Sequence, residues 1–204
     1  MKEGDGRGAM RKAGTLKKLI VMGVFAVIIG LSAGCSGEDD LLPMDPQTPS
    51  GDEEMEIRKE FRSTLDDFAI TATDLWMEDV SIHEDSSLSL YNEEYNSYLI
   101  VLTDEKVTFP EDIDLAYYSE LVSRQTTEEF EEAQVTEPEA EEFNGVKGNK
   151  FYIKGLVDGV SVTYAYLIFE NERNFYQVVL WSSTGNIENN LEYYEDILLS
   201  FEFL

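Results

Sequence analysis

The feature that most constrains the fold is strict alternation of apolar residues in the C-terminal third of the chain. Every second residue from 160 to 168 is Val, Tyr or Ile, and residues 175–182 carry apolar residues on both faces. Side chains of a strand point alternately to its two faces, so this pattern predicts strands. Asp158-Gly159 fits a two-residue hairpin turn, because glycine readily adopts positive φ. We predict an antiparallel meander of strands at 151–156, 160–168 and 175–182, with a turn at 171–174.

Shorter patterns predict three further strands upstream. Residues 68–72 alternate, and Asp74-Leu75-Trp76 reads as a bend that carries a buried aromatic ring. Residues 87–91 alternate again, and 98–102 form a continuous apolar run of the kind found in strands covered on both faces. With a turn at 92–94, the last two segments predict a hairpin.

Helical spacing appears in two places. Leu115, Tyr118 and Val122 share one face of a segment from 113 to about 128, with Asp112 or Asp114 as its N-cap. One C-terminal helix is predicted by an apolar stripe at steps of four and three: Ile187, Leu191, Tyr194, Leu198 and Phe201. Between the helices lies an acidic segment, 128–142, with a weak strand signal at 133–136. Antiparallel strands with flanking helices predict the α+β class.

The N-terminus has the layout of a secretory signal peptide. Six basic residues precede the apolar segment 19–31, and Ser32, Ala33 and Gly34 follow. Thirteen apolar residues as a helix reach about 20 Å, short of the roughly 30 Å hydrocarbon layer. We therefore expect residues 1–34 to be removed. Met10 is an alternative start, because Met10-Arg11-Lys12 supplies a basic end.

Cys35 follows directly and is the one cysteine of the chain. Leu31-Ser32-Ala33-Gly34-Cys35 resembles the lipobox of bacterial lipoproteins, although that family prefers Leu at the position of Ser32. The resemblance implies a diacylglyceryl lipid on Cys35 and attachment to the outer face of a bacterial membrane. An uncleaved anchor and an ordinary signal peptide are the alternatives. Two acyl chains bind a bilayer far more tightly than the single chain that binds marginally.

The expected mature chain has two parts. Residues 35–56 are acidic, contain three prolines and read as a tether; residues 57–204 are long enough for one core. Removing the leader leaves 9 basic and 40 acidic residues, a formal charge of −31. Such a charge repels phosphates and anionic lipid headgroups, so nucleic acid is excluded as a partner and the lipid must provide the membrane attachment.

Candidate catalytic groups are sparse. His83 is the single histidine of the chain, so a metal site built from several histidines is excluded. A serine–histidine–carboxylate triad could use only this one histidine as its base. We read His83 as an exposed loop residue and expect no metal or cofactor. The eight glutamates of 128–142 read as a solvated face rather than a calcium site. Eleven tyrosines are expected mostly under the helices, with an exposed binding patch as the alternative.

A family resemblance rests on four stretches. They are Phe68-Ala69-Ile70 leading to Trp76, Gly145-Val146-Lys147-Gly148 with Asp158-Gly159, Phe175-Tyr176-Gln177-Val178 leading to Trp181, and Ile197-Leu198-Leu199-Ser200-Phe201. From about Phe61 onward the chain resembles the PsbP/Mog1-like superfamily, in its branch of bacterial lipoproteins. The resemblance implies a sheet sandwiched by helices and a binding role.

These expectations favour a membrane-anchored, non-enzymatic module that binds a protein or envelope component. A small-ligand receptor or carboxylate-based hydrolase is the alternative, and a purely structural envelope component is a third hypothesis. Since a shared fold does not imply a shared function, no partner is carried over from the family.

Overall fold

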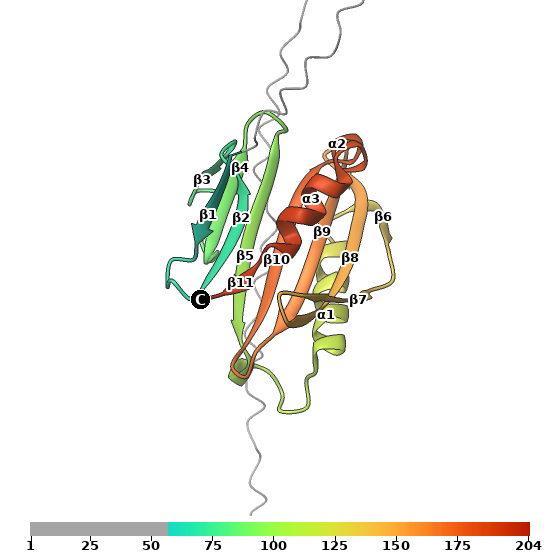
Figure 1. Ribbon diagram of the computed structural model, residues 1–204. Coiled ribbons are helices and arrows are strands. Elements are labelled where there is room, and N and C mark those ends of the chain that lie inside the picture. Colours follow the sequence, from blue (N-terminus) through green and yellow to red (C-terminus); the bar gives the residue numbers. More distant parts are fainter. Residues whose placement is uncertain (1–56) are drawn as a thin grey trace, which may run out of the picture.

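The computed structural model describes residues 57–204 and is built on an eight-stranded antiparallel sheet (Figure 1). Seven strands follow one another across it in the order β3-β4-β5-β10-β9-β8-β6, and β7 also pairs with β8. The strands are β3 (Trp76–Glu78), β4 (Leu88–Asn92), β5 (Ser97–Glu105), β6 (Glu131–Val135), β7 (Glu139–Phe143), β8 (Val146–Val157), β9 (Val160–Glu170) and β10 (Asn174–Ser183).

Different elements cover the two faces of this sheet. Helix α1 (Leu115–Thr127) lies on one face, reached from β5 through the short 3-10 helix η1 (Lys106–Thr108). The other face is covered by α2 (Thr184–Asn189), α3 (Leu191–Leu199) and a small sheet of order β1-β2-β11. That sheet consists of β1 (Arg58–Arg62), β2 (Phe68–Thr73) and β11 (Glu202–Phe203). The result is three layers with a core on each side of the main sheet.

Alternation along the strands divides the apolar residues between the two cores. On β10, Tyr176, Val178 and Leu180 face the small sheet and α3, whereas Phe175, Val179 and Trp181 face the α1 side. Both sets are almost fully buried. At about 25 cal/mol per Å² of apolar surface removed from water, burial of both faces makes the central strands the main source of stability.

The α+β class and the predicted meander are confirmed. Strands β8, β9 and β10 are consecutive and antiparallel, and Val157 pairs with Val160 across the turn. Asp158 and Gly159 have φ of 51° and 79°, as the hairpin turn requires. The β4–β5 hairpin and strand β2 also lie where alternation placed them. Asp114 caps α1 by accepting a hydrogen bond from the Tyr117 N–H at 2.8 Å.

The prediction of one continuous C-terminal helix is wrong. Asn190, with φ −125° and ψ 29°, separates α2 from α3. Its side-chain amide donates to the backbone oxygen of Asn186 at 3.0 Å and to the Asn186 side-chain oxygen at 2.8 Å. Asparagine side chains compete in this way with helical backbone hydrogen bonds. The break turns Leu191 outward, and it is 42% exposed although the stripe predicted burial.

Strands β1, β3, β7 and β11 were not predicted from the sequence. The bend expected at 74–76 is a turn at 74–75, and Trp76, which is buried as predicted, begins β3. In the part of the chain that the structure describes, no helix is long and apolar enough to cross a bilayer. The leader, the tether and Cys35 lie outside the described residues, so their predictions stay predictions.

Candidate binding groove

The helical layer meets strand β8 through charged and polar side chains. Lys150, Tyr152 and Lys154 occupy alternate positions of β8 and therefore share the face that α2 and α3 cover. Lys150 Nζ donates to Glu195 Oε1 at 2.8 Å, and the Tyr152 hydroxyl donates to the same oxygen at 2.7 Å. Further along β8, Lys154 Nζ donates to Glu188 Oε1 at 2.8 Å. These contacts hold the helices above β8 without closing apolar side chains onto it.

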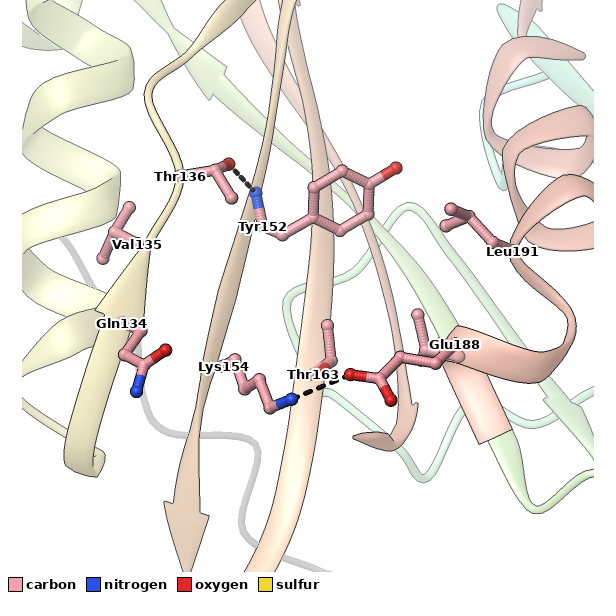
Figure 2. Close-up of a pocket in the computed structure, with 9 residues that line it drawn as sticks. Gln134, Val135, Thr136, Tyr152, Lys154, Thr163, Glu188 and Leu191 are labelled. Atoms are coloured by element: carbon pink, nitrogen blue, oxygen red, sulfur yellow. Dashed lines mark hydrogen bonds and ion pairs between the residues drawn. The ribbon is translucent and has the colours of Figure 1, made fainter. Parts of the chain in front are cut away.

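A groove of about 350 Å³ lies between the helices and β6. Figure 2 shows Tyr152 and Lys154 in the middle, Gln134 and Thr136 on one side, and Glu188 and Leu191 on the other. Val135, Thr163 and Ile187 complete the lining. Strand β6 is held in place as the wall because Tyr152 N–H donates to Thr136 Oγ1 at 2.9 Å and Thr136 N–H donates to the Tyr152 carbonyl at 3.0 Å.

The groove is mainly apolar, with one ion pair at its surface. Leu191 and Val135 are 42% and 41% exposed, so both offer apolar surface to an incoming group. The side chains of Lys154 and Glu188 are 44% and 63% exposed. Water screens a pair this exposed, and such pairs contribute about 0–1 kcal/mol. An incoming polar group therefore meets little resistance from this pair.

The charges beside the groove are fixed more firmly. Burial alone would lower the pKa of Lys150, but the hydrogen bond to Glu195 and the charges of Glu195 and Glu141 raise it. The hydrogen bond from Lys150 lowers the pKa of Glu195. Burial, reinforced by Glu195, raises the pKa of the Tyr152 phenol. At neutral pH this cluster is thus a lysine cation, a carboxylate and a protonated phenol, which positions the helix rather than exchanging protons.

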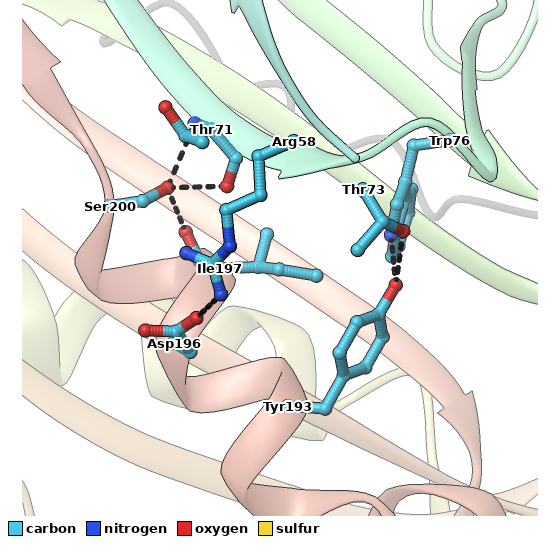
Figure 3. Close-up of polar contacts among 8 residues, drawn as sticks. All are labelled: Arg58, Thr71, Thr73, Trp76, Tyr193, Asp196, Ile197 and Ser200. Carbon is cyan, nitrogen blue, oxygen red and sulfur yellow. Dashed lines mark hydrogen bonds and ion pairs between the residues drawn. The ribbon is translucent and has the colours of Figure 1, made fainter. Parts of the chain in front are cut away.

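The other side of α3 is attached differently, as Figure 3 shows. The Tyr193 hydroxyl accepts from Trp76 Nε1 at 2.8 Å and lies 3.0 Å from Thr73 Oγ1. Ser200 Oγ accepts from the backbone N–H of Thr71 at 2.9 Å. Arg58 also pairs with Asp196 on the outer surface. Here neutral hydrogen bonds and one exposed ion pair accompany apolar packing, so α3 is held against the small sheet.

The structure corrects the prediction for His83. It lies in the loop between β3 and β4, as expected, but it is only 8% exposed. Its Nδ1 accepts from the Asp85 N–H at 3.2 Å, and its carbonyl accepts from Ser86 Oγ at 2.8 Å. These contacts order the loop, which explains the burial. Within residues 57–204, no group of three or more His, Cys, Asp or Glu side chains is placed to hold a metal ion.

The acidic segment and the tyrosines do not merge into one site. The glutamates of β6 are exposed, and Lys150 draws in Glu141 from β7 at 3.5 Å. Five tyrosines are buried: Tyr118, Tyr164, Tyr166, Tyr176 and Tyr194. The hydroxyls of Tyr118, Tyr166, Tyr176 and Tyr194 form hydrogen bonds with polar side chains, for example Tyr166 with Thr126 at 3.0 Å. Tyr152 is the tyrosine that lines the groove.

Sequence reasoning missed the groove. Its available signal was the Lys-x-Tyr-x-Lys alternation at 150–154, which places polar groups on the first strand of the predicted meander. A sheet face covered by helices normally carries apolar residues, so this alternation indicates a gap in the packing.

Known structures share the fold of this chain. Cyanobacterial PsbP (CyanoP) from Synechocystis superposes with a TM-score of 0.53 at 12% identity, covering 78% of this chain and all of that one. LpqN, described as involved in cell envelope biogenesis of Mycobacterium tuberculosis, gives 0.50 at 8% identity, covering 72% of this chain and 90% of that one. A Bacteroides thetaiotaomicron protein gives 0.50 at 12%, covering 72% of this chain and 48% of that one.

No protein-family model matches the sequence, and no curated protein matches it significantly. At these identities the structural matches show a PsbP-like fold and nothing more about function.

Proposed function

We propose that this chain is an exported lipoprotein, anchored through a diacylglyceryl lipid on Cys35, whose PsbP-like domain binds a segment of another envelope protein in the groove over β8. The observation that carries the binding role is the groove itself. It combines exposed apolar residues, Leu191 and Val135, with charged neighbours that are already paired. Such a surface suits recognition, because catalysis needs a reactive group free to exchange a proton or attack a substrate.

The location rests on the leader and on one structural neighbour. Basic, apolar and small residues precede Cys35 as in bacterial lipoproteins. LpqN, which shares the fold, is described as taking part in cell envelope biogenesis. Without the leader the formal charge is −31, which opposes contact with anionic headgroups and favours attachment by lipid rather than by a basic surface.

A small-ligand receptor is the second candidate. A volume of about 350 Å³ falls in the range of small-molecule sites, roughly 300–1,000 Å³. The groove between β6 and the helices is open to solvent, which favours an extended chain segment over an enclosed small molecule as its ligand. The hydrolase alternative requires two facing carboxylates. Among the described residues that line the groove, Glu188 is the single carboxylate, so this requirement is not met there.

Photo-crosslinking in the native host tests the binding role. Benzoylphenylalanine is placed at Leu191 in the groove or, as the control, at Leu75, which is also 42% exposed but lies in the β2–β3 turn. We expect a discrete protein adduct from position 191 and none of that mass from position 75. The same adduct from both positions, or no adduct from 191, contradicts the proposal.

The anchor is tested separately by metabolic labelling with palmitate. The wild-type chain should incorporate label and sediment with membranes, and Cys35→Ala should lose the label. An unlabelled wild type that retains its basic leader contradicts the lipoprotein assignment.

A further inference from the structure

We propose that the segment bound in the groove carries a cation, lysine or arginine, beside a large apolar residue, and that Glu188 recognises the cation. This inference rests on the proposed binding function and specifies the chemistry of the partner. The apolar residue would pack against Leu191, which is 42% exposed, from the helical side and against Tyr152 from β8. Both side chains line the groove beside Glu188 (Figure 2).

The charge around the groove selects a cation. The elements that form the two walls carry four exposed glutamates, Glu131 and Glu132 on β6 with Glu188 and Glu192 on the helices. Lys154 is the cation that lines the groove. The whole chain has a formal charge of −27, so its field attracts cations and repels anions at longer range. Charge complementarity of this kind sets which partner is favoured and how quickly it arrives.

Glu188 has room for a second cation. A carboxylate has two oxygens and about four acceptor positions. Lys154 Nζ is bonded to Oε1 of Glu188 at 2.8 Å, and the Glu188 side chain is 63% exposed. Glu195, the other carboxylate of the helices that pairs with a lysine of β8, is less accessible, because Lys150 and Tyr152 both bond to its Oε1. Glu188 is therefore the recognition group, and Lys154 competes with the incoming cation.

Three pentapeptides that differ only in charge provide the probes. In each peptide photo-leucine is the central residue. The two residues next to it are both lysine, both glutamine or both glutamate. They are added to the full chain in phosphatidylcholine nanodiscs, irradiated, and the labelled residues are located by mass spectrometry. We expect labelling around 187–191 and 134–136 in the order lysine, glutamine, glutamate. One exposed ion pair corresponds to an advantage of about two- to fivefold, which added salt should reduce.

Variants of the groove charges give opposite shifts. Glu188→Gln should remove most of the preference for the lysine peptide, whereas Lys154→Gln should increase it, since the competing cation is gone. Glu78→Gln is the matched control. It removes one exposed glutamate on β3, five strands away from β8 and so roughly 24 Å distant, which exceeds the screening length of about 8 Å.

The outcomes separate this inference from the function on which it rests. Groove labelling by the glutamine peptide with no gain for the lysine peptide overturns the cation preference and leaves the binding groove standing. Preferred labelling by the glutamate peptide also overturns it and assigns recognition to Lys154. Failure of all three peptides to label the groove overturns the proposed function together with the inference.

Discussion

Replacing Glu195 by glutamine tests whether the cluster beside the groove holds the helical layer in place. Glu195 Oε1 accepts from Lys150 Nζ at 2.8 Å and from the Tyr152 hydroxyl at 2.7 Å. The side chains of Lys150 and Glu195 are 12% and 32% exposed. The pair between Lys154 and Glu188 joins the same strand to the same layer at 2.8 Å, but with 44% and 63% exposure. Glu188→Gln is therefore a control with the same chemistry and a different burial.

The two variants should differ several-fold in how much they lower the free energy of unfolding. Hydrogen bonds to charged groups contribute about 1.5–3 kcal/mol. Glutamine keeps one oxygen that accepts a single hydrogen bond, so Glu195→Gln should destabilise the fold by about 2 kcal/mol. For Glu188→Gln we expect about 0.5 kcal/mol or less, because water screens an exposed pair. The melting temperatures should fall by roughly 4–8 °C and by less than about 2 °C, respectively. Urea and thermal unfolding of the full chain, followed by circular dichroism, provide both values.

The pH dependence of the difference gives the decisive control. The pKa of Glu195 is lowered in the folded state, so its contribution is present above the ordinary value of 4.5 and is lost as pH falls through the lowered folded pKa. The pKa of Lys150 is raised, so its contribution is present below 10.5 and is lost as pH rises through the folded pKa. Wild type and Glu195→Gln should therefore differ most between about pH 5 and pH 10. Equal losses for both variants at pH 7, or a gap that does not shrink as the pH is lowered from 4.5 toward the acid limit of folding, would refute the reasoning.

Two further predictions concern backbone approach and the attachment of α3. Gly148→Ala should destabilise the fold by about 1–3 kcal/mol in urea unfolding, because the new Cβ would lie 2.8 Å from a carbonyl of β9. Gly185→Ala, where nothing lies within 4 Å, should be neutral or stabilising by up to about 1 kcal/mol, and equal losses would contradict the steric explanation. Tyr193→Phe should cost about 1–3 kcal/mol, because it leaves the indole N–H of Trp76 buried without this acceptor. The exposed Tyr117→Phe should cost under about 0.5 kcal/mol, and a similar loss for both tyrosines would contradict the role of this bond.

The strongly alternating segments were predictable because period and burial agree in them. Strand β9 reads as a strand from its sequence, and its central residues are buried on both faces. The missed strands lack this agreement. Residues 58–62 are Arg-Lys-Glu-Phe-Arg, in which Phe61 alone is buried, and 139–143 likewise bury only Phe143. Edge strands of this kind are mostly solvated, so their sequences carry too few apolar residues to show a period.

The helix break and the groove depend on contacts between distant segments. The Asn186 side-chain amide donates to Ser97 Oγ at 3.2 Å, 89 residues away in the sequence, and Asn190 donates to the Asn186 side-chain oxygen at 2.8 Å. The spacing of apolar residues predicts a helix but does not show where a side chain will compete with the helical backbone for hydrogen bonds. The groove likewise requires knowing that Lys154 faces Glu188, which are 34 residues apart.

The two faces of β8 explain why a groove forms beside a strand that is otherwise tightly packed. On the α1 face, Phe151 and Ile153 are fully buried, and Gly155 admits Phe130 so closely that a Cβ would lie 2.8 Å from its ring. On the opposite face, Lys150 and Lys154 have long side chains that reach their glutamates across the layer. Charged side chains at these positions keep the helices from closing on the strand by apolar contact, since desolvating an ion pair costs more than its attraction returns in most geometries. Leu191, at the start of α3, then stays 42% exposed beside β8, so the groove is encoded by the lysines of β8 as much as by the helices that overhang it.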